Sequence, residues 1–329
     1  MDDVPKNLPS LTRTKKLQKR ATRVGFDWKN SEDIIAKVDE EISELKVEVN
    51  LLEKLCAPYG LVRTGVAPDH PLIKKSIEKF ALMAEPEEFN YFGNVSVGED
   101  ITIDDLKETH HAVIVTMGAE TDRKLGIPGE DLKGSHTATE FVAWYNGHPD
   151  FVNHQFDLDQ ESVAVIGVGN VAMDVARILC KTHAELAVTD MADHALEALK
   201  NSKVKNVYIL GRRGPAQAAF TPPEIKEMGE FEDADVTVLQ AEATLDPESA
   251  AVLEAEGDKN AQKNVAYIED YATREISGKS RLLTIRFLVS PTELIGEDGR
   301  VTGIKLVKNK LVKGDDGSIR PQATDEEEI

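Results

Sequence analysis

The sequence has few cysteines and no long apolar run. Cys56 and Cys180 are its only cysteines among 329 residues, and their separation fits no disulfide framework or metal-ligand spacing. No apolar stretch approaches the roughly 18–20 residues that a membrane-spanning helix needs, and no secretory h-region opens the chain. Reduced cysteines are typical of the cytoplasm. We therefore expect a cytoplasmic protein with no membrane partner.

Basic residues are scarce relative to acidic ones. Lysine and arginine number 39 against 59 aspartates and glutamates, a net charge of −20, which argues against nucleic acid as a partner. The charge is uneven, because residues 1–30 carry eight basic and three acidic side chains. That segment is +5, so the remainder must carry −25. This asymmetry predicts different origins or functions for the two parts.

The hydrophobic pattern changes near residue 47. Apolar residues from about Glu32 have helical spacing, and residues 10–24 favour a short basic helix before them. Val47, Val49 and Leu51 then alternate as in a strand. The sequence therefore predicts three segments, with boundaries at 1–46, 47–118 and 119–329.

Beyond the junction, strand-like and helix-like stretches alternate, which predicts an α/β fold. HHAVIVTMGAE (110–120) reads as a buried strand, TATEFVAWYNG (137–147) as a helix and NVYILG (206–211) as a strand. The acid-rich residues 226–258 favour a solvated helix and loop. Residues 281–312 favour several antiparallel strands, with a hairpin signal at Glu297–Asp298–Gly299.

The stretch ESVAVIGVGNVAMDVARIL (161–179) has the pattern of a strand, a tight turn and a helix. Gly167, Gly169 and Ala172 fill the three positions of G-x-G-x-x-A. The first glycine permits the turn, the second lets backbone approach a pyrophosphate, and the small third residue brings helix and sheet together. The helix would present its N-terminal amides to the phosphates. The pattern predicts dinucleotide binding, with a plain strand–turn–helix connection as the alternative.

The end of the next strand indicates which nucleotide is bound. An NAD site would place an acidic residue there to accept a hydrogen bond from the ribose 2′-hydroxyl. Here the strand runs into Gly211–Arg212–Arg213–Gly214, and guanidinium groups pair with phosphate in a bidentate way. The sequence therefore favours NADP over NAD. The alternative is a pair of solvated surface arginines.

Four stretches together resemble the adrenodoxin-reductase type of ferredoxin–NADP reductase: YGLVRTGVAPDHP (59–71), FVAWYNGHPD (141–150), VAVIGVGNVAMDVARIL (163–179) and LGRRGPAQAAFTPPEIKEM (210–228). The resemblance implies an FAD flavoprotein that moves electrons between NADPH and a ferredoxin-like iron–sulfur protein. It implies a Rossmann-like, three-layer NADP-binding domain over 119–329. It also implies an FAD-binding domain over 47–118 that is incomplete at both ends.

The same resemblance assigns roles to single residues. It implies NADP contacts from Gly167, Gly169, Asn170, Val171, Ala172, Arg212 and Arg213, FAD contacts from Glu53, Leu61 and Val97, and catalytic positions at His70 and Glu224. No metal ligand is implied.

Structural alternatives remain for three of these residues and for two aromatic residues. Glu53 is alternatively a surface acid, Glu224 a helix-cap or surface acid, and His70 a histidine that stabilises its loop. Trp144 and Tyr145 are expected to serve packing rather than chemistry.

Residues 8–48 resemble a fragment of a MazG-type nucleoside triphosphate pyrophosphohydrolase, an all-α enzyme that holds Mg²⁺ with E-E-x-x-E on one helix. Glu40, Glu41 and Glu44 match this motif. One helix by itself makes a poor Mg²⁺ site, so we expect a solvated acidic face. The sequence therefore predicts an FAD-dependent reductase in a truncated or chimaeric chain. The alternatives are a non-catalytic NADP-binding remnant and a MazG-type pyrophosphohydrolase.

Overall fold

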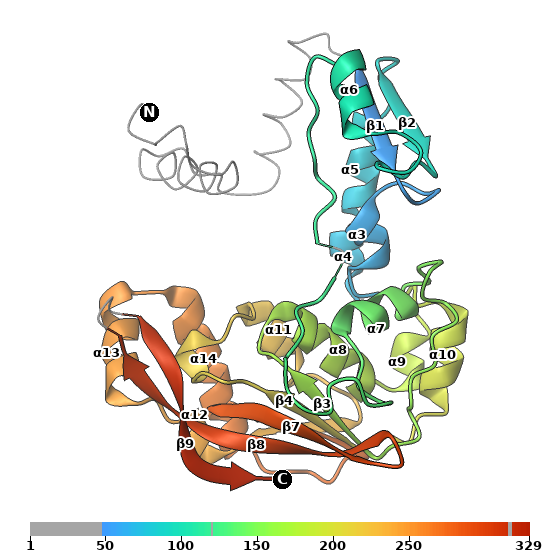
Figure 1. Ribbon diagram of the computed structural model, residues 1–329. Helices are drawn as coiled ribbons and strands as arrows, with labels where there is room; N and C mark the ends of the chain where they lie inside the picture. The colour runs from blue at the N-terminus through green and yellow to red at the C-terminus, as the bar shows by residue number, and fades with distance from the viewer. Residues whose placement is uncertain (1–47, 120, 315–317) are drawn as a thin grey trace. The chain divides into compact units, whose positions relative to one another are not determined.

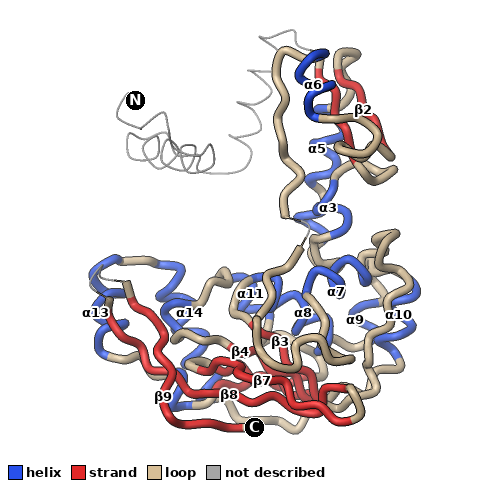
Figure 2. The backbone as a smooth tube through the Cα atoms, in the orientation of Figure 1, coloured by secondary structure: helices blue, strands red, loops and turns tan. Residues whose placement is uncertain are grey.

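The computed structural model describes residues 48–119, 121–314 and 318–329 (Figures 1 and 2). The helical segment expected over residues 1–46, with its acidic motif, lies outside these residues. Contacts divide the chain into two units. The described part of the small unit is 48–58 and 77–112, and the large unit is 59–76 together with residues from 113 onward. Residues 59–76, which the sequence places in the 47–118 segment, thus group with the large unit.

The small unit contains a short parallel pair of strands. β1 (Val49–Glu53) lies beside β2 (Phe89–Gly93), with Val49 opposite Phe89. After β2 comes α6 (Ile103–Thr109), which begins at a capping box. There Thr102 accepts a hydrogen bond from the Asp105 amide, and the Asp105 carboxylate accepts one from the Thr102 amide, so the first turn of the helix is satisfied.

A four-stranded parallel sheet forms the centre of the large unit. Its strand order is β3-β4-β6-β5 and every neighbouring pair is parallel. The bounds are β3 (Ser162–Ile166), β4 (Asn206–Leu210), β5 (Ala234–Val238) and β6 (Arg281–Arg286). Apolar residues occupy both faces of the central strands, as expected for a parallel sheet that is covered on both sides.

Helices pack on one face of this sheet. The helices from residue 138 onward are α7 (Ala138–Tyr145), α8 (Asn170–Cys180), α9 (His183–Leu186), α10 (Asp193–Lys200), α11 (Pro222–Glu227), α12 (Gln240–Ala243), α13 (Pro247–Glu256) and α14 (Lys259–Thr273). α8 packs on β3, β4 and β6, and α14 packs on β5. The helix expected over 137–147 is confirmed as α7, which begins at a capping box between Thr137 and Glu140.

An antiparallel sheet of β7 (Val289–Glu297), β8 (Arg300–Lys313) and β9 (Ile319–Glu328) completes the large unit. The hairpin predicted at Glu297–Asp298–Gly299 is confirmed. Asp298 and Gly299 have φ of 51° and 77°, as a two-residue turn of this twist requires.

Side chains of β4 show how three layers arise. Val207 and Ile209 are fully buried in the core beneath the helices. The alternate residues Tyr208 and Leu210 point the other way and pack in a second cluster with Val289 of the antiparallel sheet. Helices, parallel sheet and antiparallel sheet therefore form a three-layer, Rossmann-like α/β fold (Figure 1).

Three sequence predictions about secondary structure are wrong. Residues 112–119 form no strand, and Ile114 and Met117 are 83% and 79% exposed; Figure 2 draws this segment after α6 as loop. Apolar composition favours a strand only where a neighbouring strand can pair with it, and within the described residues none does. The acid-rich stretch contains β5, whose residues Ala234, Val236 and Val238 are buried. β6 pairs in parallel with β4 and β5, not antiparallel.

In the part of the chain that the structure describes, no helix combines the length and the apolar composition that crossing a membrane requires.

Candidate functional site

The glycine turn connects β3 to α8 at the carboxyl edge of the parallel sheet. Gly167 has φ of +126°, a conformation that side-chain-bearing residues rarely adopt. Its amide donates to the Leu210 carbonyl oxygen at 2.9 Å. A Cβ at Gly167 would lie 4.0 Å from the Cβ of Ala172. The first glycine therefore makes the turn, and the small third residue lets α8 pack closely.

The presence of glycine at position 169 has a different reason. Its φ of −113° is open to any residue, and a Cβ there would meet no protein atom within 4 Å. Neither backbone conformation nor crowding by the described chain requires glycine at this position. Close approach of a ligand to the backbone remains as the reason, because Gly169 is the N-cap of α8 and the helix N-terminus favours anions.

The next two residues differ in what they contact. The Asn170 side-chain oxygen accepts a hydrogen bond from the Thr221 amide at 2.9 Å. The Ala219 backbone amide donates a hydrogen bond to the Val168 carbonyl oxygen at 2.8 Å. Val171 is 52% exposed. The turn is thus held against the segment that leads into α11, while its outer side stays accessible.

The arginine pair follows β4 at the same edge of the sheet. A Cβ at Gly211 would lie 2.6 Å from Val168 Cγ1, so the end of β4 packs directly against the glycine turn. The backbone oxygens of Arg212 and Arg213 accept hydrogen bonds from Asn309 Nδ2 and the Leu288 amide. Neither guanidinium group forms an ion pair with another described residue. Two arginines without a described ion pair therefore follow directly after the residue that packs against the glycine turn.

A buried ionic cluster lies at the other end of α8. Arg177 is 1% exposed and donates to both carboxylate oxygens of Asp69, at 2.7 and 3.0 Å. It also donates to Asp174 at 2.5 Å and to Glu224 at 2.9 Å. Burial acts to raise the pKa of Asp69, but the hydrogen bonds and charges of Arg177 and Lys181 outweigh it and hold that pKa well below its usual range.

His70 contacts this cluster through Glu227. His70 Nε2 lies 3.0 Å from Glu227 Oε2, and Nδ1 lies 3.9 Å from Asp174 and 4.0 Å from Glu224. The hydrogen bond to Glu227 raises the pKa of His70 and lowers that of Glu227. Burial raises the pKa of Glu224 and of Asp174. The site therefore favours holding a proton on His70.

Charge balance explains this preference. The cluster contains four carboxylates, on Asp69, Asp174, Glu224 and Glu227, but only the two fixed cations Arg177 and Lys181. Ligand atoms of His70, Glu224 and Glu227 also lie within 4.8 Å of one another. Arg177 and His70 already bond these two carboxylates directly, so we assign no metal to the group.

The FAD-side positions divide between the two units. Glu53 ends β1 in the small unit; its Oε1 accepts from the Leu55 amide at 3.1 Å, and its backbone oxygen accepts from the Val95 amide at 3.0 Å. The structure thus brings Glu53 beside the loop that carries Val97, which is 44% exposed. Leu61 is 77% exposed on α3 (Gly60–Thr64) of the large unit.

Sequence reasoning missed the carboxylates and the arginine around His70 and Glu224. Asp174 with Arg177, and Glu224 with Glu227, are i, i+3 pairs that share a helix face, which was the available signal. Nothing in the sequence shows that Asp69 pairs with Arg177, 108 positions away.

Trp144 and Tyr145 are 3% and 0% exposed within the core, as expected of packing residues.

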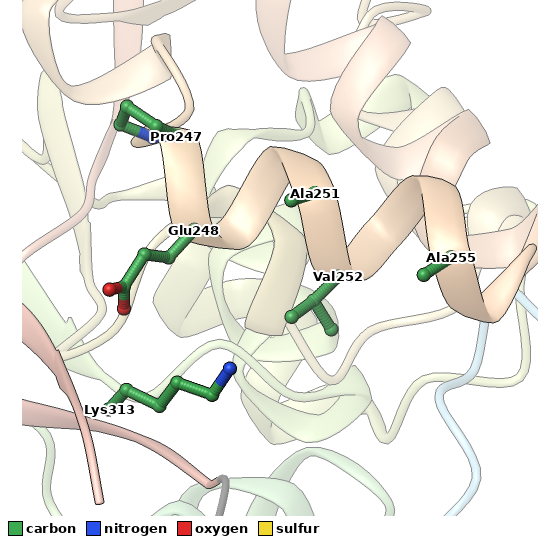
Figure 3. Close-up of a pocket in the computed structure, with 6 residues that line it drawn as sticks. All are labelled: Pro247, Glu248, Ala251, Val252, Ala255 and Lys313. Carbon is green, nitrogen blue, oxygen red and sulfur yellow. The ribbon is translucent and has the colours of Figure 1, made fainter.

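Two surface pockets lie on the α14 side of the large unit. One, of about 810 Å³, lies between α11 and α14 and includes Thr221, Lys226 and Tyr267. The other, of about 400 Å³, is formed by α13 and Lys313 of β8 (Figure 3). Figure 3 shows Lys313 extending toward the side of α13 that carries Val252, whereas the Glu248 side chain points away from Val252. Neither pocket contains the glycine turn or the arginine pair, so we assign no chemistry to them.

The chain is similar to known reductases. It is 44% identical over 292 residues to NADPH-ferredoxin reductase FprA of Mycobacterium leprae, covering 88% of this chain and 63% of that protein. It is 40% identical over 272 residues to mitochondrial NADPH:adrenodoxin oxidoreductase of Arabidopsis thaliana, covering 80% and 56%. A solved structure of Mycobacterium tuberculosis FprA in complex with NADPH matches with a TM-score of 0.83 and 44% identity, covering 89% and 64%.

The chain therefore spans less than two thirds of the length of these relatives. A comparison with protein-family profiles found no match. The MazG resemblance rests on Glu40, Glu41 and Glu44, which lie outside the described residues, and no relative reported above supports it.

Proposed function

We propose that this chain is an FAD-dependent oxidoreductase that passes electrons between NADPH and a ferredoxin-like iron–sulfur protein. The observation that carries the proposal is the junction of Gly167–Ala172 with Arg212 and Arg213 at one edge of the parallel sheet. It occurs in a chain 44% identical to proteins named NADPH-ferredoxin reductase. Because the chain spans only part of those proteins, the whole activity is a proposal for it.

The large unit supplies the residues for NADP. Gly167 makes the turn, Gly169 admits the pyrophosphate, and the first amides of α8, from Asn170 and Val171, face the phosphates. Arg212 and Arg213 pair with the 2′-phosphate. The open position at Gly169 and the uncommitted guanidinium groups fit a phosphate-rich ligand.

In the small unit, FAD contacts would come from Glu53 and from backbone at Val97. A carboxylate at the carboxyl end of β1 is the group that accepts from a ribose hydroxyl in this kind of fold, and Glu53 occupies that position. When bound, FAD supplies the ability to accept a hydride and release its electrons one at a time. One carboxylate oxygen of Glu53 accepts a hydrogen bond from the Leu55 amide, and this bond fixes the direction of the carboxylate.

His70 and Glu224 act on protons in this proposal. His70 Nε2 lies 3.0 Å from Glu227 Oε2, and this hydrogen bond raises the pKa of His70. Arg177 holds Glu224 in one orientation through a 2.9 Å hydrogen bond, while burial raises the Glu224 pKa. The pair can therefore compensate a change of charge at the redox centre by keeping or giving up a proton.

A non-catalytic NADP-binding module is the second candidate function. It is favoured by one observation: the glycine turn, α8 and the arginine pair all lie within the large unit. This candidate predicts NADPH binding without a retained flavin.

Reconstitution with FAD separates the two candidates. The purified protein is incubated with excess FAD, desalted, and assayed for bound flavin and for NADPH-dependent reduction of ferricyanide and then of a ferredoxin. The reductase proposal expects retained flavin and turnover. A protein that binds NADPH but retains no flavin and shows no turnover supports the binding module and rejects the reductase for this chain.

A further inference from the structure

The backbone that carries the arginine pair is fixed from one side. Three consecutive carbonyl oxygens each accept a hydrogen bond: Gly211 from the Val289 amide at 3.0 Å, Arg212 from Asn309 Nδ2 at 2.9 Å, and Arg213 from the Leu288 amide at 3.1 Å. All three donors belong to the β6–β7 link or to the antiparallel sheet. The position of the two guanidinium groups therefore depends on the third layer of the fold.

Among these three donors, only Asn309 donates through its side chain; Val289 and Leu288 donate through their backbone amides. Asn309 is 8% exposed in β8, at an irregularity in the register between Val307 and Asn309. Its amide nitrogen also lies 2.8 Å from Ser290 Oγ, and this second contact fixes the orientation of the group. A bulge of this kind redirects a side chain out of the normal alternation of a strand.

The neighbouring link is held in an unfavourable conformation. Leu288 has φ of 58°, the left-handed region that costs a leucine free energy. Its amide donates to Arg213, and its carbonyl oxygen accepts from the Asn309 backbone amide at 2.7 Å. Asn309 thus supports both the Arg212 carbonyl and the strained link that supports Arg213.

We propose that Asn309 is a positioning residue for discrimination between NADPH and NADH. By holding the backbone of Arg212 and Arg213, it keeps their guanidinium groups where a 2′-phosphate binds, without touching the nucleotide. This inference rests on the proposed function, because it requires that NADP occupies the glycine turn and the arginine pair.

The effect is expected on one nucleotide only. Asn309→Leu keeps the approximate size of the side chain but removes both donated hydrogen bonds and leaves the Arg212 carbonyl unpaired. Loss of these hydrogen bonds should weaken the affinity for NADPH about three- to tenfold. NADH lacks the 2′-phosphate, so its affinity should change less than about twofold in the same variant.

The experiment measures dissociation constants for NADPH and NADH by titration of the full chain. Asn264→Leu is the matched control, because Asn264 is a 3% exposed asparagine of the same unit whose side chain donates to the Phe220 carbonyl. The control should leave the ratio of the two constants unchanged. Equal weakening of both nucleotides in Asn309→Leu, or an unchanged ratio, overturns the inference.

A double-mutant cycle tests whether Asn309 acts through Arg212. In an Arg212→Ala background, Asn309→Leu should change the ratio far less than it does in the wild type. A full additional loss of discrimination contradicts the proposed route. Asn309→Ser, a smaller change, serves the same cycle if the leucine variant does not fold.

Different results would reject the NADP assignment and the role of Asn309. If the wild-type chain does not discriminate between NADPH and NADH, or if Arg212→Ala leaves its discrimination intact, the NADP assignment itself is wrong. If the wild type discriminates, Arg212→Ala abolishes this and Asn309→Leu does not alter it, only the inference about Asn309 is overturned.

Discussion

The large and small units differ in how their proposed site residues are held. In the large unit, Gly167, Arg212 and Arg213 are fixed by hydrogen bonds to neighbouring strands above a continuous buried core. In the described part of the small unit, Leu106 is the only buried residue, and Glu53 ends a sheet of two strands. A two-stranded sheet has little independent stability. The NADP-side geometry is therefore a property of the large unit's own packing, whereas Glu53 lacks such support.

The buried ionic cluster should give the largest effect. Arg177→Leu removes the cation that Asp69, Asp174 and Glu224 share and leaves Asp174 and Glu224 without the cation that bonds them, so we expect a loss of about 3–5 kcal/mol in the free energy of unfolding. Urea denaturation followed by circular dichroism measures it. Arg274→Leu, at an exposed arginine paired with Asp270, should cost less than about 1 kcal/mol. Similar losses in the two variants would show that the cluster is not a buried network.

Core truncations test the contrast between the two units directly. Ile209→Ala, at a fully buried position of β4, should lower the free energy of unfolding of the large unit by about 2–5 kcal/mol. Leu106→Ala in the small unit should leave the main unfolding transition nearly unchanged, because Leu106 belongs to neither buried cluster of the large unit. An equal shift of the main transition by both changes would contradict the separation into two units.

The arginine pair should determine which nucleotide binds. Arg212→Ala removes a charge-assisted contact to the 2′-phosphate, so NADPH affinity should fall about 10- to 100-fold while NADH affinity stays nearly constant. Fluorescence titration with both nucleotides measures the change. The control is Arg123→Ala, at an exposed arginine of the same unit, which should alter neither affinity. A parallel loss for NADPH and NADH would rule out the 2′-phosphate role.

The pKa values of two histidines should shift in opposite directions from the ordinary value. The hydrogen bond to Glu227 raises the pKa of His70, whereas burial lowers the pKa of His136. Since the pKa of His70 is raised on folding, its pairing stabilises the fold fully below the unfolded value of about 6.5, and this contribution is lost as pH rises through the folded pKa. NMR titration measures both groups.

Glu227→Gln should return the His70 pKa toward its ordinary value. Glu230→Gln is the control, because Glu230 pairs with Lys226 on the surface, and it should leave His70 unchanged. A His70 pKa that is the same with and without Glu227 would contradict the pairing.

Local features of the site could be predicted from the sequence, and non-local ones could not. The glycine turn, α8 and the strand that precedes Arg212 each depend on residues within one short stretch. The support of Arg212 by Asn309 joins residues 97 positions apart, and the Asp69–Arg177 pair joins residues 108 apart. Such pairs follow from the tertiary fold, which local periodicity does not encode.

The errors in secondary structure have the same origin. Residues 112–119 are apolar enough for a buried strand, yet no described strand pairs with them. β5 lies in an acid-rich stretch, yet its apolar residues alternate and pack beneath α14. Strand formation in both places depends on the available partner rather than on composition.

Anaerobic mixing tests the central claim most directly. The FAD-reconstituted chain is mixed with NADPH or NADH, and the absorbance of oxidised flavin is followed over time. The proposed function predicts that NADPH bleaches the flavin at far lower concentration than NADH does, because Arg212 and Arg213 hold the 2′-phosphate. Retained flavin that neither nucleotide bleaches, or that both bleach at equal concentration, would contradict it.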